Sequence, residues 1–114
     1  MTHILGVVLR AMDSPQTAQF YSALGLTVFE HEHGGPRHYA VEKISGDFVL
    51  EIYRKSENFK RDALMVEVES ITAALAVVQK FGIEAHTELK DTGSMKFIYI
   101  TDPDGRDVIL IQKR

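Results

Sequence analysis

The order of predicted secondary-structure elements repeats along this chain: a strand, a helix and three further strands occur twice. The first set falls within about residues 1–55 and the second within about 62–114, although the two halves share little sequence. Each helix can cover one face of its sheet, so the other face is left to line a shared cleft. The pattern predicts one α+β domain, with two βαβββ units forming a cup-shaped, partly closed eight-stranded sheet with helices outside.

The first set is assigned from apolar alternation together with capping and turn residues. Either Ser14 or Asp13 can cap the helix, and Gly25 ends it. The apolar stripe of this helix is expected to consist of Phe20, Tyr21 and Leu24. The four strands of this half are expected at 4–10, 26–33, 37–44 and 47–54.

The second set follows a polar connection, "SENFKR", at residues 56–61. Its helix is expected to begin after Ser70 and to end at Gly82. In "DPDG" the proline and glycine occupy the second and fourth positions of a β-turn. The four strands of this half are expected at 63–68, 83–89, 95–101 and 107–112.

Composition excludes several classes of protein and of site. The chain has 114 residues, of which 45% are hydrophobic, which suits one domain with a modest core that dimerisation would enlarge. Its net charge of −3 gives no reason to expect a nucleic-acid partner, and no apolar run of ~18 residues predicts a membrane span. With no cysteine, disulfides, thiolate nucleophiles and cysteine-based zinc sites are excluded. We expect a cytoplasmic homodimer with no nucleic-acid or membrane partner.

Three segments together resemble a known family: "SPQTAQFYSALGLTV", "FVLEIYR" and "FIYITDPDGRDVILIQ". In order and spacing they are similar to the glyoxalase / bleomycin-resistance / extradiol-dioxygenase superfamily, also called the vicinal oxygen chelate fold. The resemblance extends over nearly the whole chain and implies the cup described above. It implies little about activity, because one fold hosts many chemistries.

The resemblance also implies where a metal would be held. Metal-dependent members of the family use four side chains, which here fall at Gly6, Glu51, Ala63 and Ile109. Only a carboxylate among these four can coordinate a divalent ion, and one carboxylate does not hold such an ion tightly. A shift of the assignment by one residue would add a single further donor, Asp62. The resemblance therefore predicts a member without a metal cofactor, with a divalent metal as the alternative.

A second possible metal site is the segment "HEHGGPRH" at residues 31–38. If Gly34 and Gly35 form a two-residue hairpin turn, His31 faces His38, and both lie on one side of the ribbon with His33. Three imidazoles would suit zinc or nickel. The favoured interpretation is a solvated hairpin, because histidines are ordinary on an exposed strand face.

Strand alternation predicts which side chains would line the cup and bind a ligand. The lining is mainly apolar and aromatic, with one arginine and two acids, which suits a flat or amphipathic organic molecule with a charged group. The predicted ligand-binding residues are Val8, Arg10, Val49, Glu51, Tyr53, Met65, Glu67, Phe97, Tyr99 and Ile109.

Two of these residues have alternative roles that the sequence leaves open. Glu51, the only catalytic candidate, either contacts the ligand, acts as a general base or forms a structural ion pair with Arg10. Arg10 occupies a position at which glyoxalase-like relatives bind an anionic part of their substrate, so it either takes a carboxylate or phosphate or pairs with Glu51.

Four functions remain open. The favoured one is metal-free binding of an aromatic or amphipathic small molecule. The first competitor is a metal-dependent lyase, isomerase or dioxygenase with an altered ligand set. The second is a metal-free enzyme that uses Glu51 as its base. The third is a dimeric interaction module with a vestigial cup.

Overall fold

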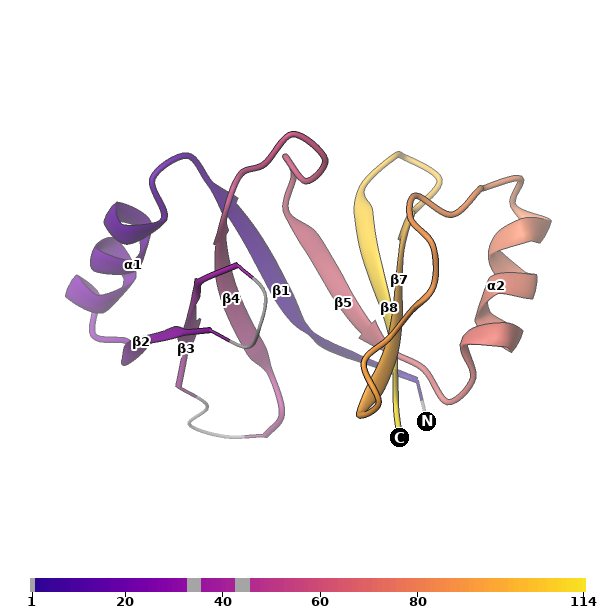
Figure 1. Ribbon diagram of the computed structural model, residues 1–114, viewed down its shortest axis with the longest axis horizontal. Coiled ribbons are helices and arrows are strands. Elements are labelled where there is room, and N and C mark those ends of the chain that lie inside the picture. Colours follow the sequence, from indigo (N-terminus) through magenta and orange to yellow (C-terminus); the bar gives the residue numbers. More distant parts are fainter. Residues whose placement is uncertain (1, 33–35, 43–45) are drawn as a thin grey trace. The chain divides into compact units, whose positions relative to one another are not determined.

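The computed structural model describes residues 2–32, 36–42 and 46–114. Within them the element order is strand, helix, three strands, twice over, which confirms the predicted α+β class (Figure 1). The chain divides into two compact units. The N-terminal unit is Gly6–Asp62, and the C-terminal unit is Ala63–Arg114 together with the first residues of the chain.

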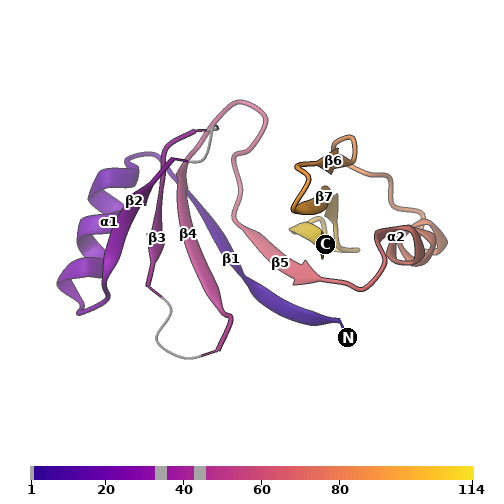
Figure 2. The same ribbon diagram turned by 60° about the horizontal axis from the view of Figure 1, so that its bottom comes forward.

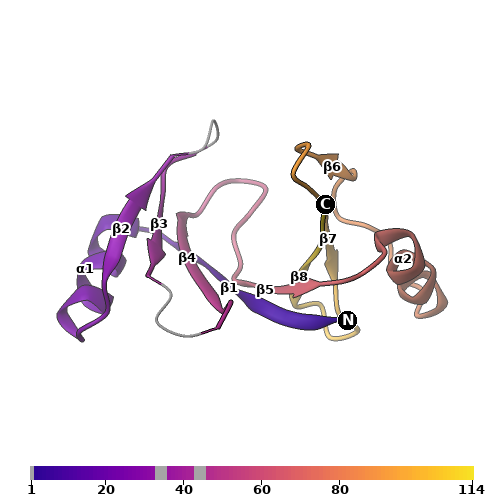
Figure 3. The ribbon, with the colours of Figure 1, turned by 90° about the horizontal axis from the view of Figure 1, so that it is seen from below.

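The N-terminal unit is a four-stranded sheet with one helix against it (Figure 3). The spatial order of its strands is β2-β3-β4-β1, with β1 parallel to β4 and the other pairs antiparallel. The elements are β1 (His3–Ala11), α1 (Ser14–Ala23), β2 (Val28–His31), β3 (His38–Val41) and β4 (Val49–Arg54).

The C-terminal unit repeats this plan, with α2 beside the β7–β8 pair (Figure 2). Its strand order is β5-β8-β7-β6, with β5 parallel to β8. The prediction of a strand at 83–89 is wrong, because this segment is a loop. It forms isolated hydrogen bonds to β7, such as the one from the His86 N–H to the Tyr99 carbonyl oxygen at 2.7 Å. The elements are β5 (Ala63–Glu67), α2 (Ile71–Lys80), β6 (Lys90–Asp91), β7 (Met95–Thr101) and β8 (Asp107–Lys113).

Both helices begin and end where the sequence predicts. Of the two candidate caps for α1, Asp13 is the one used, and its carboxylate accepts the N–H of Gln16 at 3.0 Å. The Ser70 hydroxyl accepts the N–H of Ala73 at 3.1 Å in the same way. Both end glycines are left-handed, with φ of 111° at Gly25 and 71° at Gly82. Among the described residues, no helix is long and apolar enough to cross a membrane.

The N-terminal core lies between α1 and the sheet, and it corrects the predicted apolar stripe. Ala18 and Tyr21 of α1 pack against Ile52, which has no exposed surface. Phe20 is instead 59% exposed, because adjacent residues of a helix point about 100° apart and its neighbour Tyr21 is the one that points inward. Leu24 is 66% exposed because α1 ends before it, so the helix no longer directs it inward.

The C-terminal core is the corresponding layer between α2 and its sheet. Its buried members are Val68, Ile71, Ile98, Ile100 and Leu110. The "DPDG" turn joins β7 to β8 as predicted, and the Asp102 carboxylate accepts the backbone N–H groups of Arg106 and Asp104, both at 2.9 Å. The bond from the Arg106 N–H is the largest cause that lowers the pKa of Asp102, and the Arg106 guanidinium adds to it.

Candidate functional site

Strand register brings four polar or aromatic side chains into one row across the N-terminal sheet. His31 on β2 pairs with His38 on β3, as predicted, and Arg10 on β1 pairs with Tyr53 on β4. Tyr39 and Ile52 pair between β3 and β4 and face α1, so their neighbours His38 and Tyr53 face the other side, one beside the other. We call His31, His38, Tyr53 and Arg10 the polar row.

Neighbouring members of the polar row lie close together, and two of them are stacked. The rings of His38 and Tyr53 lie nearly parallel, with centroids 4.4 Å apart and planes at 9°. The Arg10 guanidinium carbon lies 4.7 Å from the centroid of the Tyr53 ring, and His31 lies 5.7 Å from His38. Because β4 lies between β3 and β1, Tyr53 is flanked by an imidazole on one side and a guanidinium on the other. Stacking thus orients the cation.

Glu51 joins this row through an acid–imidazole contact. Its Oε2 lies 3.3 Å from Nε2 of His38, and Nδ1 of His38 lies 3.3 Å from the carbonyl oxygen of Pro36. His38 is 4% exposed, whereas the Glu51 side chain keeps 25% of its surface exposed. Sequence offered Arg10 as the structural partner of Glu51, but the structure gives Glu51 a histidine and gives Arg10 aromatic rings. Glu51 is therefore the member of the pair that solvent or a ligand can reach.

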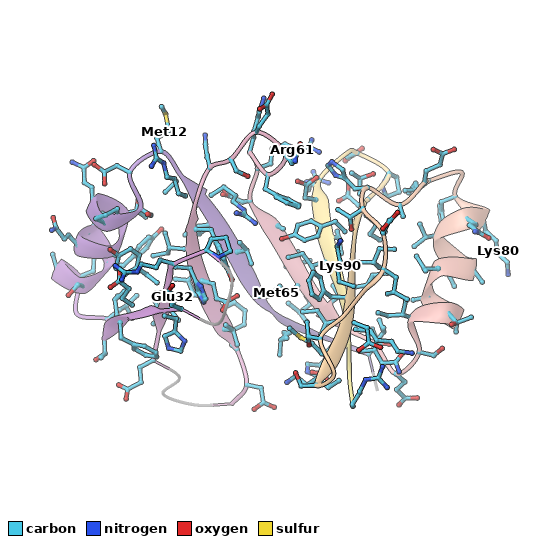
Figure 4. All side chains as sticks on the ribbon, in the orientation of Figure 1. Met12, Glu32, Arg61, Met65, Lys80 and Lys90 are labelled. Carbon is cyan, nitrogen blue, oxygen red and sulfur yellow. The ribbon has the colours of Figure 1, made fainter. Side chains whose placement is uncertain are left out.

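Arg10 has a second aromatic neighbour that sequence reasoning missed. Phe59, from the polar connection, has its ring centroid 5.0 Å from the Arg10 guanidinium carbon. Arg10 also donates from its backbone N–H to Asp62 Oδ1 at 2.9 Å, and from Nη1 to the carbonyl oxygen of Arg54 at 3.5 Å. The available signal was a lone phenylalanine in an otherwise polar connection. Arg61, in the same connection, is labelled in Figure 4.

The other predicted ligand-binding residues of this unit lie on the same sheet face. Val8 pairs with Glu51 and is 3% exposed, and Val49 pairs with Gly6 and is partly buried. At Gly6 the strands approach so closely that an added Cβ would lie 1.9 Å from the carbonyl oxygen of Val49. Only glycine fits there without a shift of the backbone.

In the C-terminal unit the predicted residues also share a face, the one turned away from α2. Register aligns Met65 with Ile109 and Tyr99, and aligns Glu67 with Ile111 and Phe97. Met65 and Ile109 are 4% and 5% exposed; Met65 is labelled on β5 in Figure 4. The Glu67 carboxylate lies 3.4 Å from His3 Nε2 and 3.4 Å from Lys113 Nζ. A single cup lined by both units stays a prediction.

The four family metal positions do not fit a metal ion in this structure. Gly6 has no room for a side chain, and Ala63 and Ile109 are buried and apolar. Glu51 alone offers a donor, and it already contacts His38. Among the described residues, no three His, Cys, Asp or Glu side chains are grouped so that they could hold a metal. The proposed third histidine, His33, lies outside the described residues. No chemistry is therefore assigned through a metal.

Comparison with known proteins matches the chain to one family model. The model described as Glyoxalase/Bleomycin resistance protein/Dioxygenase superfamily covers residues 2–110. No curated protein sequence matches the chain.

Several solved structures resemble the chain in fold. A hypothetical protein from Bacillus halodurans C-125 is 12% identical, with a TM-score of 0.71 over 99% of this chain and 95% of its own. A glyoxalase/bleomycin resistance protein/dioxygenase superfamily member from Vibrio splendidus 12B01 is 18% identical, with a TM-score of 0.67 over 99% and 100%. Methylmalonyl-CoA epimerase from Mycobacterium tuberculosis is 13% identical, with a TM-score of 0.65 over 96% and 85%. At these identities the likeness concerns the fold alone.

Proposed function

The chain belongs to the glyoxalase/bleomycin resistance protein/dioxygenase superfamily, and from this premise we propose that it binds a small aromatic molecule bearing a carboxylate, without a metal cofactor. The binding surface is the polar row of the N-terminal unit together with Glu51. Arg10 takes the carboxylate, and the rings beside it take the aromatic part of the ligand. Membership of the superfamily accounts for the fold, and the side chains of the polar row are the reason for proposing this kind of ligand.

One observation carries the proposal: a guanidinium that lies over two aromatic rings. Arg10 lies 4.7 Å from the Tyr53 centroid and 5.0 Å from the Phe59 centroid. A guanidinium held in this way keeps its planar fork in a defined orientation, which favours two parallel hydrogen bonds to a carboxylate. The adjoining rings present apolar surface to the rest of the ligand.

Glu51 adds a requirement on the polar groups of that ligand. A carboxylate with a quarter of its surface exposed accepts hydrogen bonds and repels a second anion. The ligand is therefore expected to place its own carboxylate at Arg10 and a hydroxyl or N–H group near Glu51. This polarity distinguishes an amphipathic acid from a purely apolar molecule.

Isothermal titration calorimetry with phenylacetate, indole-3-acetate and the uncharged 2-phenylethanol tests the proposal. We expect at least one of the two acids to bind in the presence of EDTA and the alcohol to bind more weakly. Arg10→Met should weaken acid binding by at least about tenfold, the size expected for losing a charge-assisted pair. Arg37→Gln is the matched control, because Arg37 is an exposed arginine of the same unit that pairs with Glu30 and Glu32. Equal effects of the two substitutions would refute the assignment to Arg10.

Glu51 also supports a second candidate function, metal-free proton transfer. Its carboxylate is reachable, while His38 behind it is buried and tied to a backbone carbonyl. In such a reaction Glu51 would take a proton from a carbon beside a ligand carbonyl and return it, with no further reactant needed. Deuterium uptake from D₂O into 2-oxo-4-phenylbutyrate, followed by NMR, tests this. Exchange that Glu51→Gln abolishes while binding persists would support it; exchange at the buffer rate would exclude it.

A further inference from the structure

We propose that Phe59 is a ligand-contacting residue that sets the preference for an aromatic ligand, and that the connection carrying it closes over Arg10 as a strap. The strap is defined as Lys55–Asp62. This inference rests on the proposed function, because it assigns the aromatic selectivity of the same site to one residue. No motif in the sequence distinguished this segment from a solvated loop.

Exposure first sets Phe59 apart from its surroundings. Within Arg54–Asp62, all of which the structure describes, every residue is exposed except Phe59, which is partly buried. Its ring lies against the Arg10 guanidinium, whose carbon is 5.0 Å from the ring centroid. A polar segment that directs its one aromatic residue onto a cation uses that residue for a specific contact.

The backbone of the strap explains how Phe59 reaches Arg10. At one end, Lys55 N–H donates to the carbonyl oxygen of Ala11 at 2.8 Å. At the other, Arg10 N–H donates to Asp62 Oδ1 at 2.9 Å. Both ends are thus fastened to neighbouring residues of β1, so the segment between them forms a closed loop.

The apex of that loop is itself a tight turn. Ser56 N–H donates to the Phe59 carbonyl oxygen at 3.0 Å, and Phe59 N–H donates to the Ser56 carbonyl oxygen at 3.3 Å. These reciprocal bonds fix the backbone from which the Phe59 side chain projects. Ring and guanidinium are therefore held together by the side-chain contact and by the backbone.

A carboxylate bound at the edge of the Arg10 guanidinium brings the rest of its molecule next to Phe59. An aromatic ligand would stack on or meet the edge of this ring, whereas a saturated ring of the same size would make only ordinary apolar contact. We expect the aromatic ligand to bind on the order of three- to tenfold more tightly than its saturated counterpart, and the ligand to stabilise the strap.

The experiment compares phenylacetate with cyclohexylacetate, which has the same carboxylate and a saturated ring. Calorimetry gives the ratio of their dissociation constants for the wild type, for Phe59→Leu and for the control Phe48→Leu. Phe48 belongs to the same unit and is 54% exposed. We expect a ratio near one in Phe59→Leu, with the wild-type ratio kept in Phe48→Leu. Circular dichroism of each variant establishes that it is folded.

Hydrogen exchange gives a second measurement that needs no variant. Phenylacetate should slow exchange of the Ser56 and Phe59 amides in the wild type. Two results would overturn the role of Phe59 and leave the proposed function standing. One is an unchanged ratio of the two dissociation constants in folded Phe59→Leu. The other is a lack of protection of these amides when the wild type is fully bound to phenylacetate. If neither phenylacetate nor indole-3-acetate binds the wild type at all, the proposed function fails and this inference with it.

Discussion

The two units place very different side chains at corresponding positions of the same backbone plan. Arg10 and Glu67 each lie three residues before a helix cap, and each pairs with a residue of its parallel neighbour, Tyr53 in one case and Ile111 in the other. By the same correspondence, His38 and Glu51 of the N-terminal unit match Phe97 and Ile109. At these positions the N-terminal sheet face carries a histidine and an acid, and the C-terminal face carries a phenylalanine and an isoleucine. One backbone plan can therefore carry different side chains, and the proposed binding of a charged ligand is assigned to the N-terminal unit because of its side chains.

The largest effect is expected at Gly6, where the N-terminal unit packs its parallel strands too closely for a side chain. Its counterpart in the C-terminal unit is Ala63. In Gly6→Ala the new Cβ would lie 1.9 Å from the Val49 carbonyl oxygen, so β1 and β4 must move apart. We expect a loss of about 3 kcal/mol in the free energy of unfolding, measured by urea titration. Ala63→Gly, which only removes a buried methyl, should cost about 1 kcal/mol. Equal losses would contradict this difference.

The next prediction converts the polar face towards its apolar counterpart. His38→Phe alone leaves Glu51 beside a ring without a nitrogen for its carboxylate to contact, so the free energy of unfolding should fall by about 2 kcal/mol. Adding Glu51→Ile gives these two positions the residue types of Phe97 and Ile109, their counterparts in the C-terminal unit, and should recover most of this loss. The coupling is measured by a double-mutant cycle in urea. Additive losses would show that the contact between His38 and Glu51 contributes nothing.

No stabilisation is expected from added metals. Protein purified without a histidine tag should contain less than roughly a tenth of an equivalent of transition metal by mass spectrometry. Added Zn²⁺, Ni²⁺ or Mn²⁺ should leave the melting temperature unchanged, because metal that binds only weakly stabilises little. About one equivalent of metal retained through a weak chelator would revive the metal-dependent lyase, isomerase or dioxygenase. His31 and His38 would then be the first residues to substitute.

The smallest effect expected from a substitution concerns the turn between β7 and β8 in the C-terminal unit. The lowered pKa of Asp102 means that its carboxylate stabilises the folded state above its unfolded pKa, about 3.9. That stability is lost as the pH falls through the lower, folded pKa. Asp102→Asn should therefore reduce the melting temperature at pH 7 more than at pH 2. Asp104→Asn, altering a carboxylate that is more exposed, is the control. An equal reduction at both pH values would show that the negative charge is irrelevant.

Helix boundaries and strand alternation could be predicted because their causes are local. Asp13, Ser70 and the two end glycines act through bonds to residues within one turn. The 83–89 segment was misassigned because its alternation resembles a strand, while its pairing depends on a distant edge. Phe20 was misplaced for a related reason, since a difference of one helical position decides which of two adjacent aromatics is buried.

The candidate site shows the same division between local and distant causes. By itself the sequence determined the repeated βαβββ order, the helix caps, the β2–β3 pairing of His31 with His38 and the alternation that sends Arg10, Glu51 and Tyr53 to one face. These follow from backbone periodicity and nearest-neighbour bonds. Only the tertiary structure decided that Glu51 lies against His38, and that the Phe59 ring lies against the Arg10 guanidinium. Such contacts depend on strand register and on the path of a connection, which no local pattern specifies.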